Sequence, residues 1–154
     1  MTQRTTSAIA VAASRAEVMA VIADFAAYPT WVDAVKETEV LARGSDGRPA
    51  QVRFVLDAGV VKDEYVLAYD WDDDTAVRWH LVRGKVLTAM DGSYVLSEAV
   101  PEALSAAGAG ATEVTYTLSV DVAIRVIGMI KRKAEKVVID TALTELKRRV
   151  ESGG

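Results

Sequence analysis

The chain has 154 residues, 51% of them hydrophobic and 26% charged, a composition typical of a globular protein rather than a disordered or fibrous one. Its length predicts one domain, residues 1–154, with a substantial core. The net charge of −4 supplies no general attraction for phosphate backbones, so we expect no nucleic-acid partner. With no cysteine and one histidine, the chain excludes disulfides, thiolate metal sites and cysteine nucleophiles, and we expect no metal centre.

The sequence indicates neither a cofactor nor a membrane span. Its glycines do not form the phosphate-binding motif that follows a strand and opens a helix, so we expect no nucleotide cofactor. The longest uncharged runs, residues 5–14 and 103–112, have 10 residues each, whereas a membrane-spanning helix needs roughly 18. Residues 8–13 form only a short apolar stretch, which is a weak match to a secretory signal. We therefore expect a cytoplasmic protein.

The first elements are a strand at residues 5–11 and two short helices. Ser14, with Glu17 three residues later, fits a capping box and predicts the start of a helix. Tyr28 and Pro29 break this helix, and Pro29 can open a second one that extends to Val35. Apolar residues recur at helical spacing in the first helix, at Val18, Val21, Ile22 and Phe25.

The middle of the chain has the period-two alternation of strands. The expected strands and their connecting turns are a strand at 38–42, a turn at 45–49, a strand at 51–58, a strand at 64–71, a turn at 72–74, a strand at 77–82, a turn at 83–85 and a strand at 86–96. In the last of these, Gly92 is interpreted as a β-bulge, and a hairpin turn at Asp91-Gly92 is the alternative.

The last third of the chain predicts a flexible hairpin loop at 103–111, a strand at 113–122 and a helix at about 124–151. The helix would be on the order of 40 Å long, enough to cross a whole sheet. One polar stripe along it carries Lys133, Lys136, Asp140, Thr144, Lys147 and Glu151. The opposite side carries Ile127, Ile130, Ala134, Val137, Val138, Ala142, Leu146 and Val150.

This order of elements predicts an α+β fold, in which the final helix covers one face of an antiparallel sheet. Three segments carry a more specific pattern: residues 28–32 (YPTWV), 79–84 (WHLVRG) and 92–96 (GSYVL). With them, nearly the whole chain resembles the START-like, helix-grip (SRPBCC) superfamily, in its bacterial polyketide cyclase/dehydrase-like and coenzyme-Q-binding-like branch. The resemblance implies a curved sheet of about six or seven strands wrapped around a long C-terminal helix, with two short helices after the first strand.

The resemblance also implies an apolar cavity between the sheet and the last helix. The strand residues expected to line it, which alternation independently places on the inward faces, are Phe54, Tyr65, Tyr69, Trp79, Met90, Tyr94 and Tyr116. Ile130, Ala134 and Val137 would close the cavity from the helix. The alternative is that these side chains simply fill a core, because pockets and cores are lined by the same residue types.

Candidates for chemistry are few. Alternation places Arg53, Asp57 and His80 on the outward faces, so we assign no catalytic residue. The inward tyrosine hydroxyls are better hydrogen-bond donors than bases at neutral pH. Residues 72–74 form an acidic turn, interpreted as solvated rather than as a cation site.

The final helix also has a basic beginning. Positive charge surrounds Ile127, Met129 and Ile130, at Arg125, Lys131, Arg132, Lys133 and Lys136. This segment is interpreted either as a solvated helix face or as a site of transient contact with an anionic membrane surface.

The resulting functional prediction is binding or transport of a hydrophobic small molecule, such as a lipid, a quinone or a polyketide-like compound. The alternatives are a polyketide cyclase/aromatase or dehydratase-like enzyme, and a module whose groove receives an apolar segment of another protein.

Overall fold

The computed structural model describes residues 5–57, 62–98, 111–122 and 128–152, and the side chains of residues 128–132 and 134 are outside this description. The expected loop at 103–111 lies outside the described residues except for Ala111, which is buried. Residues 123–127, at the start of the expected final helix, also lie outside them. Among the described helices, none is both long and apolar enough to cross a membrane.

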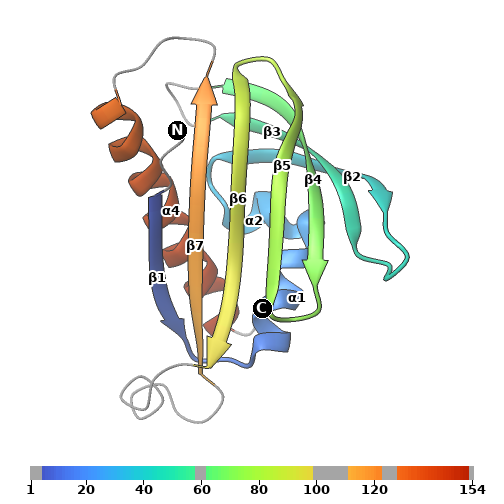
Figure 1. The fold of residues 1–154 in the computed structure, drawn as a ribbon. Helices are drawn as coiled ribbons and strands as arrows, with labels where there is room; N and C mark the ends of the chain where they lie inside the picture. The colour runs from blue at the N-terminus through green and yellow to red at the C-terminus, as the bar shows by residue number, and fades with distance from the viewer. Residues whose placement is uncertain (1–4, 58–61, 99–110, 123–127, 153–154) are drawn as a thin grey trace.

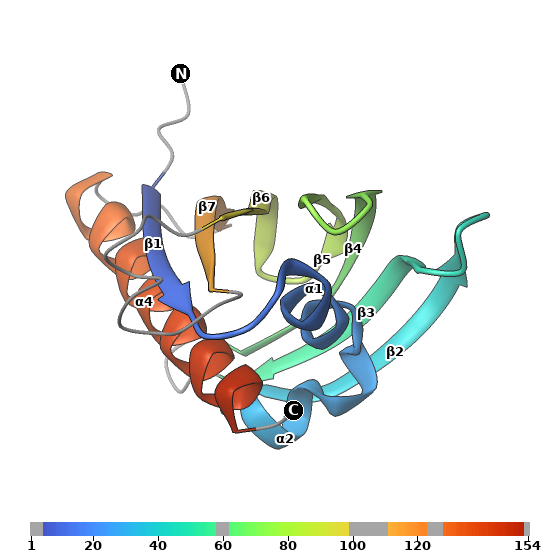
Figure 2. The same ribbon diagram turned by 90° about the horizontal axis from the view of Figure 1, so that it is seen from below.

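Seven antiparallel strands form one curved sheet, as expected (Figures 1 and 2). Their order across the sheet is β1-β7-β6-β5-β4-β3-β2, so the first strand pairs with the last. The strands are β1 (Thr5–Val11), β2 (Val35–Arg43), β3 (Pro49–Asp57), β4 (Lys62–Asp72), β5 (Ala76–Gly84), β6 (Leu87–Glu98) and β7 (Thr112–Val122).

The helices lie on the concave side of the sheet, with α4 along β1 and β7 (Figure 2). They are α1 (Arg15–Ala23), α2 (Tyr28–Trp31) and α4 (Gly128–Glu151), and a short 3₁₀ turn at Phe25–Ala27 joins α1 to α2. This arrangement confirms the predicted α+β class with a sheet wrapped around a long C-terminal helix.

The predicted capping box at the start of α1 is present, with the Glu17 N–H donating to Ser14 Oγ and the Ser14 N–H donating to Glu17 Oε1. The two helices are shorter than expected. Asp24 leaves the helical region at φ −87° and ψ 74°, so α1 ends at Ala23. The second helix ends at Trp31, because Val35 already pairs with Leu56 as the first residue of β2.

Helix α4 is fastened to the sheet by polar bonds along its length. The buried Glu135 carboxylate accepts bonds from Thr5 Oγ1 at 2.9 Å and from the Val120 N–H at 2.8 Å. At the other end, Glu151 accepts from the Ala12 N–H at 2.8 Å, and Lys147 Nζ donates to the Ala10 carbonyl at 2.9 Å. These bonds join α4 to both β1 and β7 and set the rotation of the helix about its axis.

This rotation agrees with the expected apolar side at Ala142, Leu146 and Val150, but it differs from the expectation at Val137 and Val138. The buried positions of α4 are Glu135, Ile139, Leu143, Leu146 and Val150. Val137, expected to close a cavity, is 58% exposed, and Val138 is 50% exposed. The reason is geometric: successive helix residues are about 100° apart, so Val137, two residues from both Glu135 and Ile139, lies on the opposite side of the helix.

Gly92 is neither a bulge nor a turn, so both interpretations of it were wrong. Strand β6 runs through it, and Gly92 pairs with Trp79 on β5 and with Leu118 on β7. The Trp79 indole lies over Gly92, where a β-carbon would be only 2.3 Å from the ring atom Cζ2. The irregularity of β6 lies instead between Leu87 and Ala89. Gly92 is needed for the close approach of the indole.

Asp63, a buried carboxylate at the start of β4, organises the turn between β5 and β6. Its oxygens accept backbone bonds from Glu64 at 2.7 Å, from Lys85 at 2.9 Å and from Leu87 at 2.9 Å. Burial by itself would raise the pKa of Asp63, but the surrounding backbone N–H groups outweigh it and lower the pKa below its ordinary value. The carboxylate therefore stabilises the turn in its ionised form.

We predict that Gly92→Ala destabilises the protein by about 1–3 kcal/mol, because the new methyl group collides with the Trp79 ring. Urea denaturation gives the free energy of unfolding, and near-ultraviolet circular dichroism reports the tryptophan environment. Gly44→Ala is the control, since its β-carbon would meet the movable Asp46 carboxylate at 3.2 Å. Equal stabilities of the two variants would contradict the packing argument.

We predict that Asp63→Asn lowers the free energy of unfolding by about 1–3 kcal/mol at pH 7, because an amide cannot accept all of these bonds. A pKa that is lower in the folded than in the unfolded state stabilises the fold above about pH 4, and this contribution disappears as the pH falls through the folded pKa. Urea denaturation between pH 7 and pH 2.5 should therefore show that the free energy of unfolding falls less steeply with decreasing pH in Asp63→Asn than in the wild-type protein. Asp70→Asn, at an exposed position of the same strand, should keep the wild-type slope.

Candidate ligand-binding site

All ten aromatic residues of the chain form one connected network on the concave side of the sheet. Trp79 lies at the centre of the part of the network that the sheet provides. Its ring centroid is 5.9 Å from that of Tyr69, 5.4 Å from that of Tyr94 and 5.6 Å from that of Tyr116. Tyr94 and Tyr116 are also in contact, at 4.6 Å. Because these residues come from β4, β5, β6 and β7, the network crosses most of the width of the sheet.

The other half of the network joins the sheet to the short helices. Phe25 contacts Tyr28 at 4.9 Å, Phe54 at 5.9 Å and Tyr69 at 4.9 Å, and Tyr28 contacts Trp31 at 5.0 Å. Sequence reasoning did not place Phe25, Tyr28 or Trp31 in the site. Residues 28–32 were interpreted as the step between the two helices and as part of the family resemblance but not as part of the site, although the aromatic residues beside Pro29 were an available signal.

The structure places the expected strand residues on the inward faces. Phe54, Tyr65, Trp79, Tyr94 and Tyr116 are buried. Tyr69 and Met90 are half-buried and pack against the core. From the helix, Val137 is exposed and does not face the network, whereas the side chains of Ile130 and Ala134 lie outside the described residues. The candidate site is therefore built chiefly by the sheet.

Four tyrosine hydroxyls in this network have no hydrogen-bond partner among the described residues: those of Tyr65, Tyr69, Tyr94 and Tyr116. Tyr28 differs, because its hydroxyl donates to the Ile22 carbonyl at 2.5 Å. Within the described part of the chain, Trp31 Nε1 is the one fully enclosed side-chain nitrogen or oxygen without a partner. The four hydroxyls are thus not fully enclosed, and each retains a small accessible surface.

These hydroxyls remain protonated at neutral pH. Burial raises the pKa of Tyr65, Tyr69, Tyr94 and Tyr116 above its ordinary value, and neighbouring tyrosine hydroxyls add to the shift for the first three. A group of neutral O–H donors inside an aromatic lining can bind the oxygen acceptors of an apolar molecule.

A carboxyl group lies at the helix side of this region. Glu145 on α4 is half-buried, and its Oε2 accepts a bond from the Asp33 N–H at 3.3 Å. Burial and the charge of Asp33 raise the pKa of Glu145, although Arg148 partly opposes them. The charge of Glu145 in turn contributes to the raised pKa of Tyr94. Sequence reasoning did not single out Glu145, because its contact with Asp33 joins residues 112 positions apart.

The three polar candidates on the strands face outward, as predicted. Arg53 binds three glutamates on the outer surface, Glu37 at 2.5 Å, Glu39 at 3.0 Å and Glu64 at 2.6 Å. His80 is exposed on β5. Asp57 forms an ion pair with Lys62 at 3.8 Å. None of these three groups is therefore available to a molecule on the concave face.

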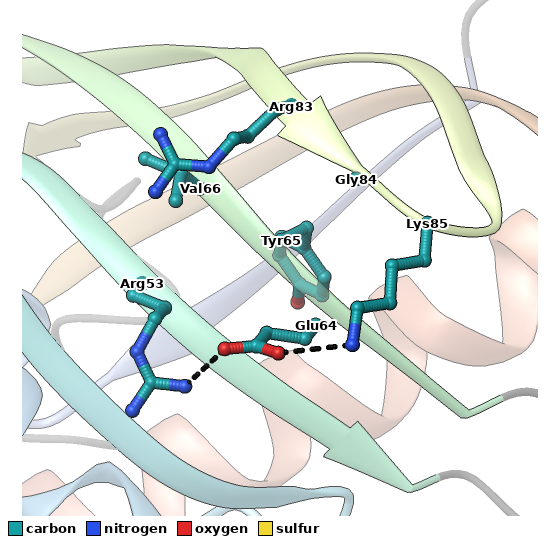
Figure 3. Close-up of a pocket in the computed structure, with 7 residues that line it drawn as sticks. All are labelled: Arg53, Glu64, Tyr65, Val66, Arg83, Gly84 and Lys85. Atoms are coloured by element: carbon teal, nitrogen blue, oxygen red, sulfur yellow. Dashed lines mark hydrogen bonds and ion pairs between the residues drawn. The ribbon is translucent and has the colours of Figure 1, made fainter.

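A shallow groove of about 220 Å³ adjoins the Arg53 cluster (Figure 3). Glu64 bridges Arg53 and Lys85 there, with the Lys85 contact at 3.2 Å, so the principal charges of this groove already neutralise one another. The groove is lined by Arg53, Glu64, Tyr65, Val66, Arg83, Gly84 and Lys85. A second groove of about 180 Å³ lies between the N-terminal helices and the end of α4, beside Trp31 and Arg149. In the described part of the chain, no three acidic or histidine side chains converge on a metal position.

Comparison with solved structures finds the same fold in several bacterial proteins. A START superfamily protein from Mycobacterium smegmatis has a TM-score of 0.85 and 24% identity, with 97% of each chain covered. A Thermus thermophilus protein has a TM-score of 0.77 and 20% identity, with 99% of each chain covered. An aromatase/cyclase from Streptomyces has a TM-score of 0.77 and 16% identity, covering 100% of this chain and 99% of its own.

A sequence comparison with curated proteins gives no match. A family model described as polyketide cyclase / dehydrase and lipid transport, however, matches residues 11–147. This match spans the chain from the end of β1 to the last turns of α4 and includes every strand of the aromatic network. The chain therefore belongs to the polyketide cyclase / dehydrase and lipid transport family.

Proposed function

We propose that this protein binds an apolar small molecule that carries oxygen acceptors, such as a quinone, a lipid or a polyketide-like compound, among the aromatic side chains of the concave face. The observation that carries this proposal is the set of unpartnered hydroxyls of Tyr65, Tyr69, Tyr94 and Tyr116. These hydroxyls keep a small accessible surface, so a partner from outside the chain, either water or a ligand, can bond to them. A ligand's carbonyl or hydroxyl oxygens supply one.

Binding is favoured over catalysis by the chemistry of these groups. A phenol whose pKa is raised by burial donates hydrogen bonds well but does not act as a base near neutral pH. The stronger acid–base candidates, Asp57 and His80, lie on the outer face. The proposed role is therefore to hold or carry the molecule rather than to convert it.

A cyclase or dehydratase-like activity is the second candidate, because Glu145 on α4 is a half-buried carboxyl group whose pKa is raised by burial. Such an enzyme needs a proton-transfer group near its substrate. The Streptomyces aromatase/cyclase that shares this fold is consistent with that chemistry.

A cytoplasmic, single-domain protein remains part of the proposal, together with transient membrane contact through the first half of α4. Arg125, Lys131 and Arg132 lie outside the described side chains, but Lys133 and Lys136 are exposed close to the exposed Val137 and Val138. Exposed apolar and basic residues on one helix suit an anionic lipid surface.

For membrane contact, we expect the protein to sediment with phosphatidylglycerol vesicles but not with phosphatidylcholine vesicles. Lys133→Glu combined with Val137→Asp should reduce the bound fraction severalfold, because both side chains are exposed and their replacement leaves the core intact. Sedimentation that does not depend on anionic lipid would reject this contact.

For ligand binding, we expect the wild-type protein to bind 2-methyl-1,4-naphthoquinone more tightly than 2-methylnaphthalene, which has the same rings without carbonyl acceptors. The double variant Tyr94→Phe, Tyr116→Phe should lose about 2- to 10-fold in quinone affinity for each hydroxyl that bonds the ligand. Quenching of tryptophan fluorescence measures both affinities. Stability should not fall, because these hydroxyls have no described protein partner.

His80→Ala is the matched control, since His80 is exposed on the outer face and its removal should leave both affinities unchanged. Failure of the wild-type protein to bind either compound would count against the concave face as a site. Equal affinity of wild type and the double variant for the quinone would show that the hydroxyls do not contact the ligand.

A further inference from the structure

Arg149, in the last turn of α4, differs from the other half-buried arginines in its pairing. Among the described residues, three arginines are half-buried: Arg48, Arg53 and Arg149. Arg48 pairs with Asp74 at 2.6 Å, and Arg53 pairs with three glutamates on the outer face. The Arg149 guanidinium has neither an ion pair nor a hydrogen bond in the described part of the chain. Its partial burial therefore removes hydration from a charge without replacing it.

The acidic residues of the same helix do not neutralise Arg149. Glu145 lies one turn earlier, at the spacing that favours an ion pair with Arg149. It accepts a bond from the Asp33 N–H at 3.3 Å instead. Glu151 pairs with Lys147 at 2.5 Å. The guanidinium can therefore offer its N–H donors to a molecule from outside the chain.

Arg149 lines the groove of about 180 Å³ between the N-terminal helices and the end of α4, where these elements lie beside one another (Figure 2). Four of the six lining residues supply apolar surface: Ala20, Val21, Ala27 and Trp31. The sixth is Asp24, an exposed residue at the end of α1 whose carboxylate has no partner among the described residues. None of the four tyrosines of the proposed ligand site lines this groove.

Arg149 and Asp24 thus have opposite charges in one groove, yet no ion pair within 4 Å joins these two described residues. A simple carboxylate would be attracted by Arg149 and repelled by Asp24, and a simple amine would meet the reverse. A molecule that carries both an ammonium and a carboxylate group complements both charges. An apolar side chain on that molecule would pack against the apolar lining.

We propose that this groove binds a small apolar amino acid as its zwitterion, with the carboxylate at Arg149, the ammonium at Asp24 and the side chain on the apolar surface. An arginine binds a carboxylate well, because its planar fork donates two parallel hydrogen bonds. The groove volume of about 180 Å³ corresponds to about six liquid waters at about 30 Å³ each. It therefore suits a small molecule rather than a segment of a macromolecule.

Three probes with the same isobutyl group separate the two charges: L-leucine, 4-methylpentanoate, which lacks the ammonium, and 3-methylbutylamine, which lacks the carboxylate. In a proton–nitrogen NMR titration at pH 7, L-leucine should shift the indole N–H signal of Trp31, which lines the groove. Trp31→Phe assigns this signal among those of the three tryptophans. We expect 4-methylpentanoate to bind about 2- to 5-fold more weakly than leucine, and 3-methylbutylamine about 3- to 10-fold more weakly.

Substitution of each charged residue should remove one of these preferences. Arg149→Gln should bind leucine no better than 3-methylbutylamine, and Asp24→Asn should bind leucine no better than 4-methylpentanoate. Neither side chain has a described partner, so both variants should keep the fold, which circular dichroism checks. Arg149→Lys, which keeps the charge without the planar fork, should fall between wild type and Arg149→Gln. Arg148→Gln is the matched control, since Arg148 is exposed and does not line the groove.

Equal binding of leucine and either singly charged analogue by the wild-type protein would overturn the zwitterion assignment. Unchanged leucine affinity in both Arg149→Gln and Asp24→Asn would overturn it as well. Phosphoethanolamine carries both charges without an apolar side chain, and its tighter binding would replace the amino acid by a lipid headgroup. No shift of the Trp31 signal at millimolar leucine would reject the site. Each of these results leaves the proposed function intact, because the naphthoquinone titration probes a separate set of residues.

Discussion

The contact between Trp79 and Gly92 is the constraint on which the concave face depends. The indole occupies the space that a side chain at position 92 would fill, with a β-carbon there only 2.3–2.6 Å from three of its ring atoms. From that position Trp79 touches Tyr69, Tyr94 and Tyr116. A residue other than glycine at position 92 would displace the indole and, with it, the tyrosines whose hydroxyls define the candidate site.

The two faces of the sheet differ in how their polar groups are paired. On the outer face the charges satisfy one another, as Arg53 does with three glutamates drawn from β2 and β4. On the concave face the hydroxyls of four tyrosines are neutral and have no partner among the described residues. A surface whose bonds are complete has little to offer a ligand, whereas unpaired donors in an aromatic setting can bind one.

Helix α4 links these features to function because its rotation decides which carboxylates face the sheet. Glu135 and Glu151 serve the fold, since they accept backbone bonds from β7 and from the residue after β1. With these anchors in place, Glu145 is directed toward the segment after α2, where the Asp33 N–H donates to it.

The sequence by itself determined the strand pattern, the inward faces and the start of α1. Alternation is a local property, so Phe54, Tyr65, Tyr94 and Tyr116 could be assigned to one face without knowledge of the fold. A capping box is equally local, which is why Ser14 and Glu17 were read correctly. The resemblance to the START-like superfamily added the curvature and the position of the last helix.

Only the tertiary structure decided that Val137 and Val138 are exposed, what Gly92 does and where Glu145 lies. Val137 was expected inside because it is apolar, but the bonds of Glu135 to β1 and β7 rotate it outward. Gly92 is explained by a ring on the neighbouring strand, and Glu145 by a backbone group 112 residues away. Each of these contacts joins distant segments, and no local periodicity encodes them.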